Sequence, residues 1–369
     1  MLLLRRIFLV LAISWFTSGL TAQDRYRGHP VISAEELETD YRLGDAWFRG
    51  WWSIAPELAH DTLSLTLYAP SEDFAFYTDR DSITFPLTDG TIKDFYVRLP
   101  DGQMAHTIVQ ATVFTLELDP IAHATTPVDA RLRPYYASES PFLDSLAELY
   151  PINPVAKNEL DLVAEILQWT HQRWEHSGNH SPSKSDALTI LEEAAAGGRF
   201  PCFAYAIVLR DQLTVAGFAA RTIYLKTADA ATRQGSPGHV ATEVYLPESK
   251  RWVFLDGQFG LLPVLDGRPL NAVEFQQALA NDYADLAFLG GGEISKAEYA
   301  EFVADYLFYL DTSLDHRSTP EKRYLVDDKR SMMLVPTGAP ELSKVSFWDM
   351  DVDYVVYTRS LGDFYAAPR

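Results

Sequence analysis

The chain has 369 residues, of which 47% are hydrophobic and 13% aromatic, so it can bury a full core and is not an intrinsically disordered protein. Its formal net charge is −20, and a surface of that charge repels nucleic acid and anionic lipid. These values exclude a nucleic-acid-binding role and leave room for two domains of ordinary size.

Residues 1–22 have the three regions of a secretory signal peptide. Arg5 and Arg6 form the basic region, residues 7–16 the apolar region, and residues 17–22 a small-residue region with cleavage expected at its end. The apolar region is shorter than the roughly 20 residues that cross a bilayer, which favours export over a single membrane anchor. We therefore expect a periplasmic or extracellular protein, without stable membrane insertion after the signal is removed.

Residues 23–140 are predicted to form a β-rich, sandwich-like domain. Hydrophobic and polar residues alternate around Leu63, Ile83 and Phe95, and Asp-Gly pairs after the last two runs are typical of turns. Three tryptophans are expected in the core of this domain, with a carbohydrate-binding face as the alternative: Trp47, Trp51 and Trp52.

The hydrophobic period changes at Pro141, and we predict a second, mixed domain over residues 141–290. The remaining residues, 291–369, are expected to form a helix and short strands that pack on it. Helices are predicted to start at Asn153-Pro154, near Ser185, at Pro201-Cys202 and, from capping-box patterns, at Asn271 and Ser295; strands are predicted at 221–225, 239–246, 251–256, 332–335 and 354–358.

Cys202 is the only cysteine, so an exported form of this chain has no internal disulfide. It lies at the predicted start of a helix, where unpaired N–H groups and the helix dipole stabilise a thiolate and can also face an oxyanion. The alternative is a small buried hydrophobic residue without chemistry.

A predicted hairpin places a base and an orienting group together. A four-residue turn at 247–250 pairs Leu246 with Arg251, and the same register brings His239 and Asp256 to one face, about 7–8 Å apart as diagonal neighbours. A thiol nucleophile needs such a base, and the base needs an orienting group. Taken alone, the histidine is typical of polar surface and the aspartate of a turn.

Four segments resemble the motifs of the transglutaminase-like superfamily, in the family's order. Residues 197–206 (GGRFPCFAYA) resemble its nucleophile motif, and 217–221 (GFAAR) its step into the next strand. Residues 238–245 (GHVATEVY) resemble its histidine strand, and 252–256 (WVFLD) its aspartate strand. The resemblance implies an α+β fold with a papain-like core, in which helices pack on an antiparallel sheet.

The resemblance also implies cysteine-dependent acyl transfer on an amide or peptide carbonyl through a thioester. Cys202 would be the nucleophile, His239 the base and acid, and Asp256 the residue that orients the histidine. Val240 and Gly257 stand where the family often has an aromatic residue and a proline, which indicates a divergent bacterial branch. Hydrolysis by a protease or amidase is favoured over amine crosslinking, because an exposed site meets abundant water.

A non-catalytic binding module with the same core is the alternative, and the complete triad argues against it. The family supplies a second oxyanion donor from upstream of the cysteine, for which Asn179 is the candidate, and Gln258 is another. No cofactor is expected, and the partner is a protein or peptide substrate. A zinc site is not expected either, because three nearby histidines do not share one helical face: His171, His176 and His180.

Overall fold

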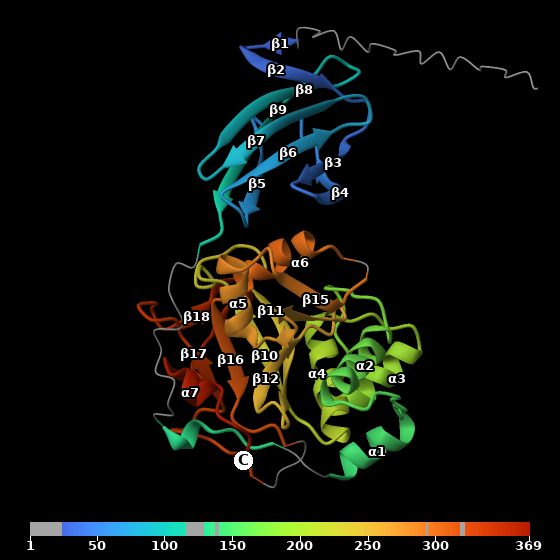
Figure 1. Ribbon diagram of the computed structural model, residues 1–369, viewed down its shortest axis with the longest axis vertical. Helices are drawn as coiled ribbons and strands as arrows, with labels where there is room; N and C mark the ends of the chain where they lie inside the picture. Colours follow the sequence, from blue (N-terminus) through green and yellow to red (C-terminus); the bar gives the residue numbers. More distant parts are fainter. Residues whose placement is uncertain (1–23, 116–128, 137–139, 293, 318–321) are drawn as a thin grey trace, which may run out of the picture.

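The computed structural model describes residues 24–115, 129–136, 140–292, 294–317 and 322–369. Figure 1 shows two parts along the long axis, with strands β1–β9 in the upper part and the helices and remaining strands in the lower part. The predicted signal peptide, residues 1–22, lies outside the described residues. Within the described residues, no helix is long and apolar enough to cross a membrane.

The upper part is built from two sheets that share one hydrophobic core. Their strand orders are β1-β2-β8-β9-β5 and β4-β3-β6-β7. Leu63, Leu65 and Leu67 of β5 all point into that core, as their period of two predicts, and meet Phe74 and Phe76 of the other sheet. The strands are β1 (Arg25–Tyr26), β2 (His29–Ser33), β3 (Glu38–Leu43), β4 (Ala46–Ser53), β5 (Asp61–Leu67), β6 (Ser71–Tyr77), β7 (Ser82–Thr88), β8 (Ile92–Arg98) and β9 (Met104–Val113).

The expectation that three tryptophans pack in this core is wrong for two of them. Trp47 and Trp51 of β4 are 40% and 48% exposed, whereas Trp52 packs against the core. The cause is the edge position of β4 and a register shift in its pairing with β3. Phe48 takes the inward position, so its neighbour Trp47 points outward and stacks on Tyr77.

A six-stranded sheet, in the order β12-β11-β10-β16-β17-β20, forms the centre of the lower part. Neighbouring strands are antiparallel except β17 and β20, which pair in parallel. One face packs with α2 and α4, through side chains such as Val244, and the other packs with α5 and α6, through side chains such as Ala241. The strands are β10 (Ala219–Lys226), β11 (Gly238–Leu246), β12 (Arg251–Leu255), β13 (Leu261–Leu265), β14 (Arg268–Pro269), β15 (Leu286–Gly290), β16 (Tyr309–Ser313), β17 (Ser331–Leu334), β18 (Lys344–Val345), β19 (Met350–Asp351) and β20 (Val355–Thr358).

The starts of several helices are set by capping side chains. The predicted start at Asn153-Pro154 is wrong, because Asn158 accepts from the Asp161 N–H and the helix begins only after it. The capping boxes at Asn271 and Ser295 are both present, as predicted. The helices are α1 (Pro141–Leu149), α2 (Glu159–His171), α3 (Ala187–Ala195), α4 (Cys202–Val215), α5 (Ala272–Asn281), α6 (Lys296–Val303) and α7 (Leu361–Phe364).

The last residues of the chain complete a buried charge pair in the sheet. Arg221 of β10 and Glu243 of β11 are fully buried and 2.6 Å apart. The Arg221 guanidinium also donates to the Phe364 carbonyl, and Glu243 accepts from the Tyr365 hydroxyl. Segment 361–369 therefore supplies partners that this pair requires, since a buried charge without partners is costly.

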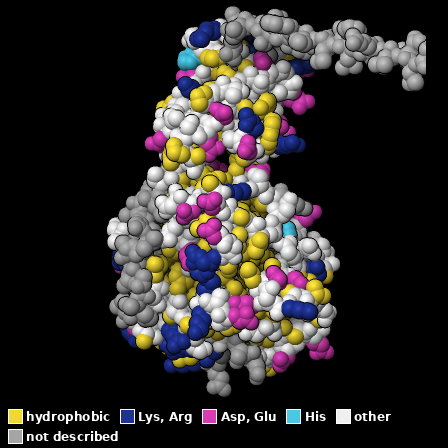
Figure 2. Space-filling model, in the orientation of Figure 1, with side chains coloured by type: hydrophobic (Ala, Val, Ile, Leu, Met, Phe, Trp, Pro, Cys, Tyr) yellow, Lys and Arg dark blue, Asp and Glu magenta, His cyan; other side chains and the backbone are white. Residues whose placement is uncertain are grey.

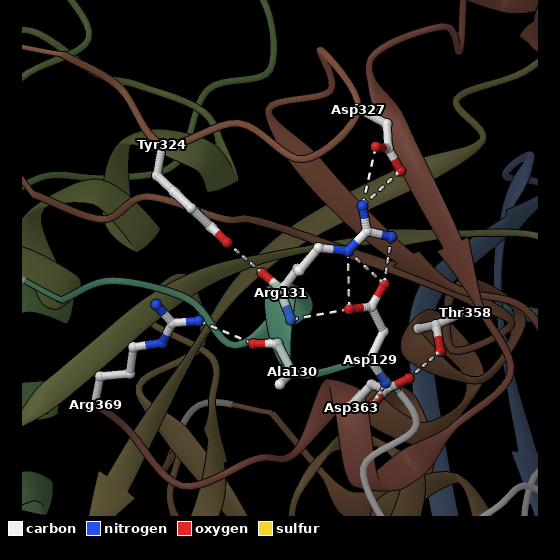
Figure 3. A network of polar contacts seen from close by, with 8 residues as sticks. All are labelled: Asp129, Ala130, Arg131, Tyr324, Asp327, Thr358, Asp363 and Arg369. Atoms are coloured by element: carbon white, nitrogen blue, oxygen red, sulfur yellow. Dashed lines mark hydrogen bonds and ion pairs between the residues drawn. The ribbon is translucent and has the colours of Figure 1, made fainter.

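A polar network fastens the short segment after the upper part to the same region (Figure 3). Arg131 forms ion pairs with Asp129 and Asp327, and its carbonyl accepts from the Tyr324 hydroxyl. Arg369 donates to the Ala130 carbonyl. Residues far apart in the sequence are thus joined at the lower end of the molecule.

Helix α6 lies between the two parts. Its Glu301 accepts from the Thr66 hydroxyl of β5 at 3.5 Å, and its Ala297 packs against the core of the upper part. Nearby, Tyr68 and Tyr283 stack with their ring centres 4.4 Å apart. Figure 2 shows hydrophobic side chains among the surface atoms where the upper and lower parts meet. The contact is therefore partly apolar and includes a carboxyl group.

Candidate active site

Cys202 is the first residue of α4, as the sequence predicts. Its N-cap is Pro201, and no side chain caps the helix start. Apart from the Ala204 N–H, which donates to the Pro201 carbonyl, the backbone N–H groups at this helix start therefore remain available to an anion. Cys202 is partly exposed and lines a cleft of about 860 Å³.

The hairpin of β11 and β12 has the expected register. Leu246 pairs with Arg251, and the ladder continues to Thr242 opposite Leu255, one residue before Asp256. His239 Nε2 lies 2.7 Å from Asp256 Oδ2, within hydrogen-bond distance. The predicted meeting of these two side chains is confirmed.

Asp256 is fully buried and is held by several donors besides His239. The Tyr299 hydroxyl of α6 donates to the same Oδ2 atom at 2.9 Å. The backbone N–H of Gln258 donates to Oδ1 at 3.0 Å, and that of Phe259 at 3.4 Å. Donors of this kind stabilise the ionised carboxylate and fix its direction. The sequence offered no signal for Tyr299, since it comes from a helix 43 residues further along the chain.

Gly257 fills the place of the proline that the family often has after the aspartate. A Cβ atom there would lie 3.1 Å from the Tyr205 Cβ of α4. The glycine thus allows α4, which carries Cys202 at its start, to approach the aspartate loop closely.

His239 is 3% exposed, and its burial lowers the pKa of the imidazole. The charge and hydrogen bond of Asp256, together with an interaction with the Cys202 side chain, outweigh that effect and raise the pKa to about 10. The imidazole is therefore protonated at neutral pH. Because Nε2 faces Asp256, Nδ1 is the nitrogen left for the thiol.

Aromatic side chains enclose the histidine. The Phe302 ring of α6 meets the His239 ring edge-on with centres 5.1 Å apart, and Tyr306 and Phe259 lie at 6.2 and 6.4 Å. This apolar surrounding limits access of water to the His239–Asp256 pair and strengthens their electrostatic interaction.

The two candidate oxyanion donors differ in position. Gln258 lines the cleft, whereas Asn179 is exposed and is not among the lining residues. His176, three residues before Asn179, does line the cleft, and its segment is fixed near Cys202 because the Ser177 N–H donates to the Phe200 carbonyl. The sequence drew attention to His176 only as a possible metal ligand.

His176 is itself exposed, like Asn179, and partial desolvation together with the positive charge of His239 lowers its pKa, against the opposite effect of Asp256. His176 is therefore neutral near neutral pH, with one N–H available as a donor. Among the residues that the structure describes, no group of three or more His, Cys, Asp or Glu side chains could hold a metal ion.

Part of the chain matches a known protein family. Residues 151–257 match the transglutaminase-like superfamily. No curated protein matches the chain. Among solved structures, the chain is similar to the 1.9 Å crystal structure of a candidate cysteine protease from Cytophaga hutchinsonii, with 14% identity and a TM-score of 0.27. That match covers 59% of this chain and 65% of the other, which is just under two thirds of that protein's length.

The matched region includes Cys202 and His239 and reaches Gly257, directly after Asp256. The part of the chain that carries these three residues is therefore a transglutaminase-like core, a fold that supports cysteine-dependent catalysis.

Proposed function

We propose that the protein catalyses acyl transfer from an amide or peptide carbonyl, with Cys202 as nucleophile, His239 as acid and base, and Asp256 as the positioning residue. The observation that carries this proposal is the place of His239. Its Nε2 is 2.7 Å from Asp256, and its ring also interacts with a thiol at the open start of a helix.

The reaction follows from the charges of these groups. The Cys202 thiolate attacks the carbonyl carbon to form a C–S bond, and the resulting oxyanion accepts hydrogen bonds from the N–H groups at the start of α4. The C–N bond then breaks, and His239 gives its proton to the leaving amine. In the second half, His239 removes a proton from water, the resulting hydroxide attacks the thioester, and the C–S bond breaks to return the thiolate.

Hydrolysis is favoured over amine crosslinking because Cys202 is partly exposed at the cleft, where water reaches the thioester. We assign the second oxyanion donor to His176, which lies in the cleft and in the segment upstream of the cysteine where the family supplies that group. Gln258 is the other candidate in the cleft. The apolar segment at residues 7–16 supports export, so we place the substrate among periplasmic or extracellular proteins and peptides.

The test compares the wild-type protein with Cys202→Ala on a pool of peptides, read by mass spectrometry with and without an added primary amine. With the wild-type protein alone, we expect one of two products. Hydrolysis gives two fragments whose masses together exceed that of the intact peptide by one water, and crosslinking gives a product that has gained the amine. The ratio of the two products decides between hydrolysis and crosslinking. Equal turnover by Cys202→Ala would refute the proposal, and so would the absence of any peptide conversion by the wild type.

A further inference from the structure

The cleft that contains Cys202 does not end at the catalytic residues. A second hollow of about 810 Å³ adjoins it, and the two share three lining residues: Ser185, Ser313 and Arg330. A chain bound at Cys202 can therefore continue past Arg330 into the second hollow.

The second hollow is positively charged, although the chain as a whole has a net charge of −20. Five cationic side chains and three acidic ones line it. The acidic residues are all engaged: Asp186 caps α3, Asp211 pairs with Arg210, and Asp315 pairs with Arg317. Lys184 and Arg330 form no salt bridge with any carboxylate of the described residues.

The Arg330 side chain is held in place at the cleft by Tyr354. Its guanidinium carbon lies 4.5 Å from the centre of the Tyr354 ring, and its backbone N–H donates to the Tyr354 carbonyl. The neighbouring carboxylate in the cleft, Asp311, is paired with the ammonium group of Lys226. A guanidinium held on an aromatic face loses little freedom when it binds a carboxylate with two parallel hydrogen bonds.

The strand register sets the distance between this cation and the catalytic residues. His239 is aligned with Leu225, Leu310 and Leu334 across four strands. Arg330 is four residues before Leu334, so the Cα atoms of His239 and Arg330 are about 15–20 Å apart at 4.8 Å per strand and 3.3 Å per residue. An arginine side chain shortens this gap, so about three to five residues of extended peptide bridge it.

We infer that the substrate is an acidic peptide, with a carboxylate bound by Arg330 about three to five residues from the amide that Cys202 attacks. The inference rests on the proposed function for the position of the reactive amide. The anion site itself is defined by the two hollows and by Lys184 and Arg330, which form no salt bridge among the described residues, although the charge of Arg330 also acts on Asp311. Lys184, which also lines the second hollow, supplies a second charge for a further acidic residue.

The test uses peptides with one reactive amide, in which a single Glu is moved from one to six residues away on either side, each matched by a Gln peptide. We expect kcat/KM to be roughly 10- to 100-fold higher for Glu at the favoured distance, the range of a charge-assisted hydrogen bond. Arg330→Gln should reduce the ratio of kcat/KM for the Glu peptide to kcat/KM for the Gln peptide at least fivefold, and Arg330→Lys should restore part of this ratio. Lys93→Gln, the same charge change on exposed β8, is the control and should leave the ratio intact.

A binding experiment separates this inference from the proposed function. Fluorescein-labelled Glu and Gln peptides are titrated with Cys202→Ala and with Cys202→Ala/Arg330→Gln, and anisotropy is measured. Tighter binding of the Glu peptide that is lost with Arg330→Gln supports the anion site even if no peptide is converted. Equal binding of both peptides, or a preference that survives Arg330→Gln, would overturn it.

Discussion

Replacing Glu301 by Gln should make the protein more stable above pH 7 and should remove part of its pH dependence. Glu301 lies on α6 at the contact with the upper part, where both the hydroxyl and the backbone N–H of Thr66 hydrogen-bond to it. Burial first, and the nearby charge of Asp305 after it, raise the pKa of Glu301 from 4.5 to about 7, against the hydrogen bonds of Thr66. Three tyrosines also lie close enough for the charge of Glu301 to act on them: Tyr41, Tyr68 and Tyr283.

The sign follows from the raised pKa. The folded state holds the Glu301 proton more tightly than the unfolded chain, so this contribution to stability is complete below pH 4.5 and is lost as the pH rises through about 7. A rise from 4.5 to about 7 corresponds to at most about 3.5 kcal/mol, at about 1.4 kcal/mol per pH unit. Because Glu301 keeps some contact with solvent, we expect about 1–2 kcal/mol in practice.

The assay is thermal unfolding between pH 4.5 and 8.5 for the wild type, Glu301→Gln and the control Glu148→Gln, an exposed position on α1. The melting temperature of Glu301→Gln should match the wild type near pH 4.5 and exceed it by a few degrees at pH 8. Glu148→Gln should follow the wild type throughout. If the melting temperatures of Glu301→Gln and the wild type differ by the same amount at every pH in this range, the Glu301 carboxyl group is not held neutral at the contact.

Three other predictions concern the site. His239→Ala should slow the reaction of Cys202 with iodoacetamide at pH 7 at least tenfold, because the imidazolium that stabilises the thiolate is lost; an unchanged rate would show that the two groups do not interact. Tyr299→Phe removes one hydrogen bond to Asp256 and should lower the free energy of unfolding by about 1–3 kcal/mol; kcat should fall with little change in KM, and a rise in KM alone would contradict its positioning role. His176→Ala should lower kcat about 100-fold while alkylation of Cys202 stays at the wild-type rate, and a normal kcat would leave Gln258 as the donor.

Local patterns were sufficient to predict the starts of α4, α5 and α6 and the central hairpin, but not the start of α2. The pairing of Leu246 with Arg251 depends only on a four-residue turn, and the capping boxes at Asn271 and Ser295 depend on residues three positions apart. The meeting of His239 and Asp256 follows from that same hairpin. Such features are encoded by neighbours in the sequence.

Contacts between distant segments could not be predicted in this way. Tyr299 reaches Asp256 from α6, and Arg330 lines the cleft from the position just before β17, a strand whose place in the sheet depends on β16 and β20. Asn179 was chosen because it lies upstream of the cysteine, but the fold turns His176 toward the cleft instead. The backbone of that segment is hydrogen-bonded to the Phe200 carbonyl, a contact that the local sequence does not reveal.

The buried pair of Arg221 and Glu243 has a consequence for the order in which the chain can fold during synthesis. Strands β10 and β11 leave the ribosome long before segment 361–369, which brings the Phe364 carbonyl and the Tyr365 hydroxyl to the pair. Until then, closing the sheet would bury two charges with part of their hydrogen bonds unmade. The strands β1–β9 contain their own core and can form while the rest is being translated. We therefore expect the lower part, and the cleft with it, to acquire its native packing only after segment 361–369 has left the ribosome.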